Sequence, residues 1–292
     1  MNLKDSRILI QNKNIAIYFM IAHCFLISLG TILLKIMQFS YHIMQIMFCY
    51  NLLSCITLLL ISFFGDKALK ISCKNIKYHF LRSIFGFCGF GLFFYSLSNM
   101  PINEVRAIIS LDPILTSLFA VVCFKESINK IKIFSLIITF IGAIILLHPE
   151  NIQLSTEAIT SLLAALCFGI FNNITKKITN GKTIDQIFYL SFFSLLYTLI
   201  PATYYWSSIK KPHDIFLIFG IAILFILSSI TIFNAFKKAE LSLLMPIHFL
   251  GIIITAIFGF LFFNETISYP TIIGAFTITI GTIPLFLKKI NI

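Results

Sequence analysis

Residues Ile102 to Pro149 decide the fold of this chain, and they read INEVRAIISLDPILTSLFAVVCFKESINKIKIFSLIITFIGAIILLHP. The stretch holds an apolar run, a short charged turn at Lys125 and Glu126, and a second apolar run. Each run approaches the roughly 20 residues that a membrane-crossing helix needs. Residues Glu240 to Leu287 repeat the pattern as ELSLLMPIHFLGIIITAIFGFLFFNETISYPTIIGAFTITIGTIPLFL. The sequence therefore predicts a pair of transmembrane helices that occurs twice.

A shift of 139 positions brings the two stretches into register, so that Glu126 falls on Glu265. Each of these glutamates precedes a glycine, Gly142 or Gly281, by 16 residues. A match at fixed spacing predicts an internal duplication, which is a common architecture of secondary transporters. Further pairs in the same register are Thr116 with Thr255, Phe119 with Phe258, and Phe124 with Phe263.

The composition excludes a soluble protein. Of the 292 residues, 59% are hydrophobic and only 11% are charged, against about 25% charged in an average soluble domain. The net charge of +11 would suggest nucleic-acid binding in a soluble protein, but the basic residues follow the short loops between apolar runs, which points to membrane topology. The seven cysteines form no CxxC motif and are interpreted as apolar packing residues, with no metal site.

Ten apolar spans are expected, which we divide into two five-helix units over residues 14–148 and 157–288. A cytoplasmic N-terminus would place 18 of the 22 basic residues on the inner side, so both termini are predicted to be cytoplasmic. Because five is an odd number, the second unit must enter the membrane from the opposite face, and the repeats are inverted. The expected spans are 14–36, 42–64, 79–98, 103–124, 131–148, 157–175, 185–206, 214–236, 241–263 and 270–287. The fold class is therefore all-α and integral to the membrane.

These paired units resemble the EamA-like members of the drug/metabolite transporter superfamily, over nearly the whole chain. The family pattern of leucine-x-proline with a later glutamate occurs in the first half as Leu111, Pro113 and Glu126. The segment Pro246 to Leu250 also resembles one in the S-adenosylmethionine uptake carriers of intracellular bacteria, with His248 where those carriers have arginine. The resemblance implies a carrier in the bacterial inner membrane, without a cofactor, driven by exchange or a proton or other ion gradient, and it leaves the direction of transport open.

Ionisable residues within membrane spans are candidates for function by default. Asp112 lies about nine residues into the fourth span, roughly 13 Å along the helix at 1.5 Å per residue, and could attract a cationic substrate or carry a proton. The alternative is a carboxylate held by neighbouring Ser or Asn side chains. His23 and His248 also fall near mid-depth and could hydrogen-bond the substrate. Pro246 leaves a helical carbonyl without its partner, and broken helices tend to line binding sites.

Other polar residues within the spans are weaker candidates, because bonding between helices explains them equally well. Arg106 could hold an anionic group or pair with Glu104. Glu126 and Glu265, at helix ends, are interpreted as structural residues that satisfy free amide groups at the turn into the next helix. Gly142 and Gly281 complete this structural signature. The remaining candidates for the substrate pocket are Asn51, Tyr95, Asn99, Asn172 and Asn173.

The leading hypothesis is a secondary carrier for a small metabolite, S-adenosylmethionine-like or amino-acid-like, with an exporter of amino acids or drugs as the alternative. A membrane-embedded enzyme is disfavoured because the sequence has no HExxH or GxSxG motif and no paired carboxylates within a span. A scaffold or sensor would be expected to carry a soluble signalling domain, and a channel a filter motif. A homodimer is compatible with the sequence, and nucleic-acid binding is not expected.

Overall fold

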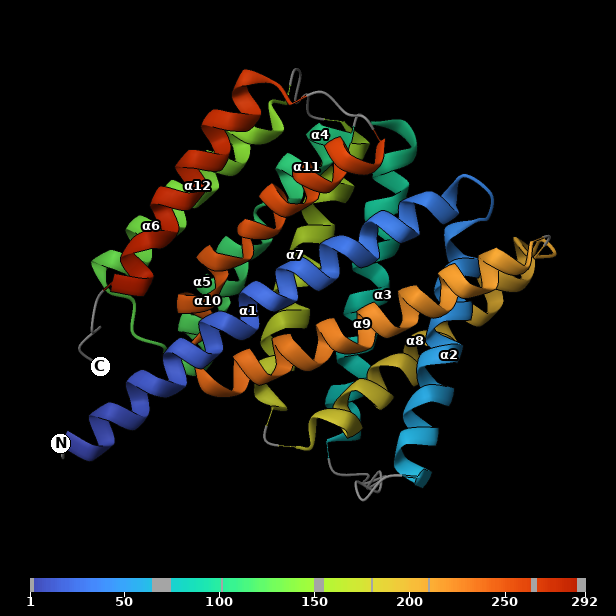
Figure 1. Ribbon diagram of the computed structural model, residues 1–292, viewed down its shortest axis with the longest axis horizontal. Helices are drawn as coiled ribbons and strands as arrows, with labels where there is room; N and C mark the ends of the chain where they lie inside the picture. The colour runs from blue at the N-terminus through green and yellow to red at the C-terminus, as the bar shows by residue number, and fades with distance from the viewer. Residues whose placement is uncertain are drawn as a thin grey trace.

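The computed structural model describes residues 3–64, 75–100, 102–149, 155–179, 181–209, 211–263 and 267–287, which are helices joined by short turns (Figure 1). Nine segments within these residues are long and apolar enough to cross a membrane. Together with the 24-residue helix α3 they make the ten predicted spans, in two inverted repeats of five. The helices are α1 Leu3–Gln38, α2 Ile43–Phe64, α3 Ile76–Asn99, α4 Ile102–Ile109, α5 Asp112–Phe124, α6 Lys130–Leu147, α7 Thr156–Lys177, α8 Thr183–Tyr204, α9 Pro212–Lys238, α10 Leu241–His248, α11 Leu250–Phe263 and α12 Tyr269–Leu287.

The fourth and ninth spans are each broken into two helices near their middle. In the fourth span, α4 ends at Ile109 and α5 begins at Asp112. Pro113, in the first turn of α5, has no amide hydrogen to continue the hydrogen-bond ladder across the break. In the ninth span α10, which contains Pro246, ends one residue before Phe249. The shift of 139 places Phe249 on Ser110, so both breaks lie at equivalent points of the duplication.

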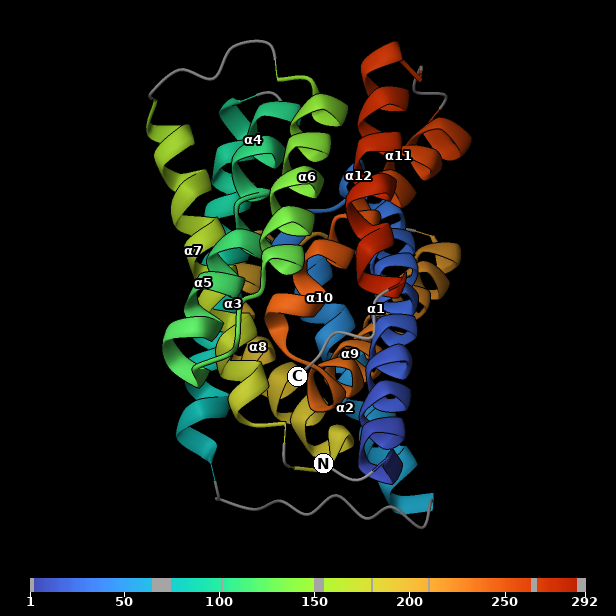
Figure 2. The same ribbon diagram turned by 90° about the vertical axis from the view of Figure 1, so that its left-hand side faces the viewer.

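The main helix pairs join the first half of the chain to the second. Helix α1 packs along α9 and α3 packs along α7, while α2 contacts α8 and α6 contacts α12. Figures 1 and 2 show α6 and α12 side by side in both views. Exchanging the two repeats converts the α1–α9 pair into α7–α3 and leaves the other two pairs unchanged. The packing therefore has the pattern that a two-fold relation between inverted repeats produces.

Glycines bring α6 and α12 into backbone contact. A Cβ atom built on Gly142 would lie 2.7 Å from the backbone nitrogen of Ile278, and one on Gly281 would lie 3.0 Å from the nitrogen of Thr139. A side chain at either glycine would force the helices apart, so only glycine allows this approach. Gly142 and Gly281, which the shift of 139 pairs, thus occupy equivalent places on the two helices.

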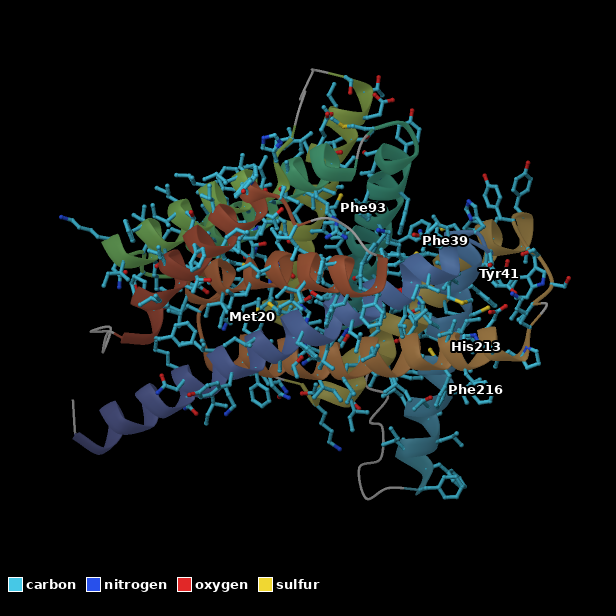
Figure 3. The ribbon with its side chains drawn as sticks, turned by 45° about the horizontal axis from the view of Figure 1, so that its top comes forward. Met20, Phe39, Tyr41, Phe93, His213 and Phe216 are labelled. Carbon is cyan, nitrogen blue, oxygen red and sulfur yellow. The ribbon has the colours of Figure 1, made fainter. Side chains whose placement is uncertain are left out.

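We name the two ends of the bundle according to the topology that the charges predict. The outer end carries the turn between α1 and α2 and the start of α9, and the inner end carries the α7–α8 and α9–α10 turns. Figure 3 shows Tyr41 and His213 close to each other at the outer end. There the Tyr41 hydroxyl donates a hydrogen bond of 2.6 Å to Oδ2 of Asp214, which ties the α1–α2 turn to α9.

Candidate functional site

A central cavity of about 460 Å³ lies between the two repeats. It is open toward the outer end, because its lining includes the exposed side chain of Gln38 and the half-buried Arg106. Toward the inner end the lining finishes at Thr175 and Phe236, both of which are fully buried. The volume lies within the range of about 300–1,000 Å³ that is usual for small-molecule sites. With the topology that the charges predict, the structure is therefore outward-facing, and the cavity lies between the two repeats.

Asp112 lines this cavity at the break of the fourth span, where its side chain is 8% exposed. Its Oδ1 accepts hydrogen bonds from Thr116 Oγ1 at 2.8 Å and from Asn172 Nδ2 at 3.2 Å. Asn173, the next residue on α7, donates to the carbonyl of Thr116 at 3.1 Å. Within the described residues no hydrogen bond reaches Oδ2, so one carboxylate oxygen is held in place while the other remains available to a ligand.

The equivalent place in the second repeat has the same hydroxyl but lacks the acid. Thr255 Oγ1 donates to Ser28 Oγ at 3.0 Å, as Thr116 contacts Asn172 in the first repeat. The shift of 139 places Gly251 on Asp112, and Ser28 donates to the Gly251 carbonyl at 3.2 Å. The duplication therefore retained the polar contact between spans, and among the described lining residues the one carboxylate is Asp112, in the first repeat.

Two histidines face the cavity from α1 and α10. The rings of His23 and His248 are stacked with their centroids 5.9 Å apart. His23 Nδ1 lies 2.8 Å from Ser228 Oγ and 3.1 Å from the Ser228 carbonyl. This contact fixes the His23 ring, so the His23 Nε2 and His248 edges are the groups that a substrate could reach. His248 is the last residue of α10, directly before the break of the ninth span.

Aromatic rings form much of the remaining wall, and most come from α3, α7 and α9. Phe90 contacts Phe168 edge-on at 5.2 Å, and Phe225 stacks on Tyr50 at 5.0 Å. All four side chains line the cavity. A wall of ring faces attracts a cationic ligand electrostatically, so it complements the carboxylate of Asp112.

The structure brings most of the predicted site residues together. Asn51 lines the cavity and donates to the Met47 carbonyl of its own helix at 2.8 Å. Arg106 lines the outer part, and its neighbour Glu104 is buried. Tyr95 is 49% exposed and lies outside the lining. The side chain of Asn99 and the whole of Glu265 fall outside the described residues.

The inner end is closed by charged contacts between the repeats, which we call the inner cluster. Glu126 accepts hydrogen bonds of 2.9 Å from the backbone nitrogens of Leu241 and Ser242. It therefore satisfies free amides of α10 in the opposite repeat, and not those of the following helix, which Asn129 caps. Lys132, buried to 4% exposure, pairs with Glu240 just before α10 and donates to Ser242 Oγ.

Lys176 makes a further contact beside the inner cluster, within the second repeat. Its Nζ donates to the carbonyls of Phe236 and Ala239, where α9 ends. A cation at the carbonyl end of a helix is favoured by the helix dipole. The predicted topology puts Lys132 and Lys176 on the inner side, and only the fold reveals that they cross between spans. Arg82, which the same topology puts on the inner side, lies fully buried.

Fold and cavity together define a multi-pass membrane protein with a duplicated five-helix unit and a cavity between its two halves. The sequence profile of the EamA-like transporter family matches residues 14–148 and again residues 155–287. The chain belongs to this family.

Characterised relatives extend over most of the chain. An S-adenosylmethionine uptake transporter of Rickettsia prowazekii is 26% identical over 88% of this chain and 87% of its own length. The corresponding protein of Rickettsia bellii is 27% identical over 88% of each chain. The pseudopaline exporter CntI of Pseudomonas aeruginosa is 22% identical over 80% of this chain and 83% of its own. One solved structure, 12% identical, superposes with a TM-score of 0.78 over 94% of this chain and 96% of that one, which supports the fold alone.

Proposed function

We propose that this chain is a secondary carrier of a small metabolite with a cationic group, S-adenosylmethionine-like or amino-acid-like. The observation that carries the proposal is the Asp112 carboxylate, held on one oxygen and facing a cavity walled by aromatic rings. The names of the Rickettsia relatives support the substrate class. The protein acts as a carrier and not as an enzyme.

The carrier would work by alternating access, with the substrate bound between the units that we place at residues 14–148 and 157–288. In the form described, the cavity opens outward and the inner cluster closes the other end. Substrate bound at Asp112 would leave inward after the inner cluster parts and the outer end closes. Exchange of one substrate for another, or movement of a proton with the substrate, would drive net transport. The two histidines beside the cavity are the groups available to hold the polar part of the substrate.

Export is the competing direction, and the pseudopaline exporter among the relatives supports it. The two directions differ in the gradients that drive the carrier, not in the fold. Counterflow from either side of the membrane separates them, with the same cavity residues required in both cases.

The first test is the Asp112→Asn variant in proteoliposomes loaded with S-adenosylmethionine. Asparagine keeps the oxygen that accepts from Thr116 and Asn172, so the protein should fold while exchange falls by about two orders of magnitude, the scale of a lost contact to a charged group. Asp214→Asn is the matched control, because that buried acid bonds Tyr41 outside the cavity. Exchange unchanged in Asp112→Asn would remove this residue from the mechanism.

Orientation is the second point to test. We propose a bacterial inner-membrane protein with both termini in the cytoplasm, supported by the distribution of lysine and arginine. Ser40→Cys lies at the outer end and Lys182→Cys at the inner end, and both positions are exposed. In intact cells an impermeant thiol reagent should label only the first above the unsubstituted chain. Labelling of only the second would reverse the assignment.

A further inference from the structure

Arg82 is a fully buried cation with unused hydrogen-bond donors. It lies in α3 near the inner end and is 0% exposed. Its Nη2 donates to the carbonyl of Gln186 at 2.6 Å, whereas its Nε and Nη1 are buried without a hydrogen-bond partner within the described part of the chain. No described carboxylate lies within ion-pair distance of it. Burying a charge is costly unless it is paired, so this state of the protein leaves the guanidinium only partly satisfied.

One aromatic ring separates Arg82 from the central cavity. The guanidinium carbon lies 5.1 Å from the ring centroid of Phe233, and Phe233 belongs to the cavity lining near its inner end. Phe233 is only 1% exposed. The cation is therefore placed directly behind the cavity wall and is hidden from any ligand in the outward-facing form.

The duplication supplies an internal comparison for this position. The shift of 139 places Ile221 on Arg82 and Phe94 on Phe233. The last residues of α3 and α9, Asn99 and Lys238, are related by the same shift of 139. In the equivalent place Ile221 is fully buried, in one apolar cluster with Phe94. Because an isoleucine fills the position in the second repeat, the packing of the fold does not require a cation there.

Phe94 and Phe233, which the shift of 139 pairs, differ in burial in the way that alternating access requires. Phe94 is half-buried where the cavity is open, while Phe233 is fully buried where it is closed. If the two repeats exchange conformations, Phe233 gains the environment that Phe94 has now. Arg82 would then border the cavity, with the N–H groups of Nε and Nη1 free to bind an acid, and guanidinium groups bind carboxylates in a bidentate manner.

We infer that Arg82 is a second binding residue of the translocation path, which takes the carboxylate of the substrate once the inner end opens. The inference rests on the proposed function and narrows it to substrates that carry both a cationic group and a carboxylate. Asp112 holds the cationic group while the cavity faces outward, and Arg82 draws the carboxylate toward the inner face.

Exchange assays with two compounds test the role of the carboxylate. S-adenosylmethionine and its decarboxylated form share the cation and differ in the acid. In Arg82→Gln, the half-saturating concentration of S-adenosylmethionine at the inner face should rise about tenfold, which corresponds to about 1.4 kcal/mol. The half-saturating concentration of the decarboxylated compound should stay the same. Arg82→Lys should give an intermediate increase for S-adenosylmethionine. Ile221→Gln, at the equivalent position, should leave the ratio of the two half-saturating concentrations unchanged. If Arg82→Gln raises the half-saturating concentration equally for both compounds, Arg82 does not bind the carboxylate and only stabilises the start of α8.

Chemical labelling gives a readout that does not depend on the cargo. The chain has only three arginines, Arg7, Arg82 and Arg106, so mass spectrometry can follow phenylglyoxal modification of Arg82 by itself. Inside-out vesicles of Glu126→Gln, which weakens the inner cluster, should react faster at Arg82 than the unsubstituted protein. Sodium acetate should slow this reaction more than sodium chloride at the same ionic strength. The inference is overturned if Arg82 does not react with phenylglyoxal, or if acetate slows the reaction no more than chloride does. If S-adenosylmethionine is not exchanged by the unsubstituted protein, the proposed cargo fails, and the labelling result still decides the role of Arg82.

Discussion

Replacing Glu126 with glutamine should shift the carrier from its outward-facing form toward an inward-facing one. The carboxylate accepts one hydrogen bond on each oxygen, from the backbone nitrogens of Leu241 and Ser242 at 2.9 Å. Glutamine has one acceptor oxygen, so one of the two bonds is lost and an amide group of the side chain faces a backbone N–H. Both bonds join the α5–α6 turn of the first repeat to the start of α10 in the second, so we expect them only while the inner end is closed.

The expected change in the ratio of inward-facing to outward-facing forms follows from the loss of one of these two hydrogen bonds. A hydrogen bond to a charged group contributes about 1.5–3 kcal/mol, and the loss destabilises only the outward-facing form. The ratio of inward to outward forms should therefore rise roughly 10- to 150-fold. Folding in the membrane should be affected less, because the inward-facing form does not use the contact.

Thiol labelling of Thr175→Cys measures the shift. Thr175 lines the inner end of the cavity and is 0% exposed, and its hydroxyl donates to the Phe171 carbonyl within α7. An impermeant reagent applied to inside-out vesicles should label it at least about tenfold faster in the Glu126→Gln background. Asp214→Asn, which weakens an outer-end contact instead, is the matched control and should not speed labelling. A labelling rate unchanged by Glu126→Gln would refute the assignment of Glu126 to the closure of the inner end.

Two further substitutions test the packing and the site. Gly142→Ala would place a methyl group 2.7 Å from the backbone nitrogen of Ile278, and such overpacking costs about 1–3 kcal/mol. Its melting temperature in detergent should fall, whereas Gly91→Ala, with nothing within 4 Å, should leave it unchanged. Asn172→Leu would remove the donor to Asp112 and should weaken binding of S-adenosylmethionine by about tenfold, on the scale of one hydrogen bond. Binding is measured by thermal shift, and equal affinity would argue against a role for the Asn172 contact.

Much of the fold was predictable because bilayer thickness and charge place strong constraints on a sequence. The apolar runs fixed the spans, and the repeat of Glu126 and Gly142 at a constant shift predicted two inverted units. Asp112 was identifiable as a candidate because placing a carboxylate within a membrane span is energetically costly, so such residues are usually functional. Each of these signals can be read from the residue types and their spacing along the chain, without knowing which helices pack together.

The contacts that close the inner end could not be predicted in the same way. Lys132 and Arg82 have the same signature as any basic residue at a cytoplasmic helix end, and only three-dimensional packing distinguishes them. The partner of Glu126 lies in the opposite repeat, 115 residues further along the chain, where sequence spacing carries no information. The break after Ile109 was missed because Pro113 is equally typical of an unbroken helix with a kink.

The pairing of α6 with α12 also has a consequence for biosynthesis. Helix α6 enters the membrane while α7 to α11 still await translation, so the surface around Gly142 faces lipid until α12 is made. The same delay applies to α1 before α9, because these partners are also distant in sequence. Neither half can bury its contact surfaces alone, and tertiary assembly must therefore come late. Chains that stall partway through synthesis would expose these grooved, glycine-lined surfaces, which quality-control proteases of the membrane could recognise.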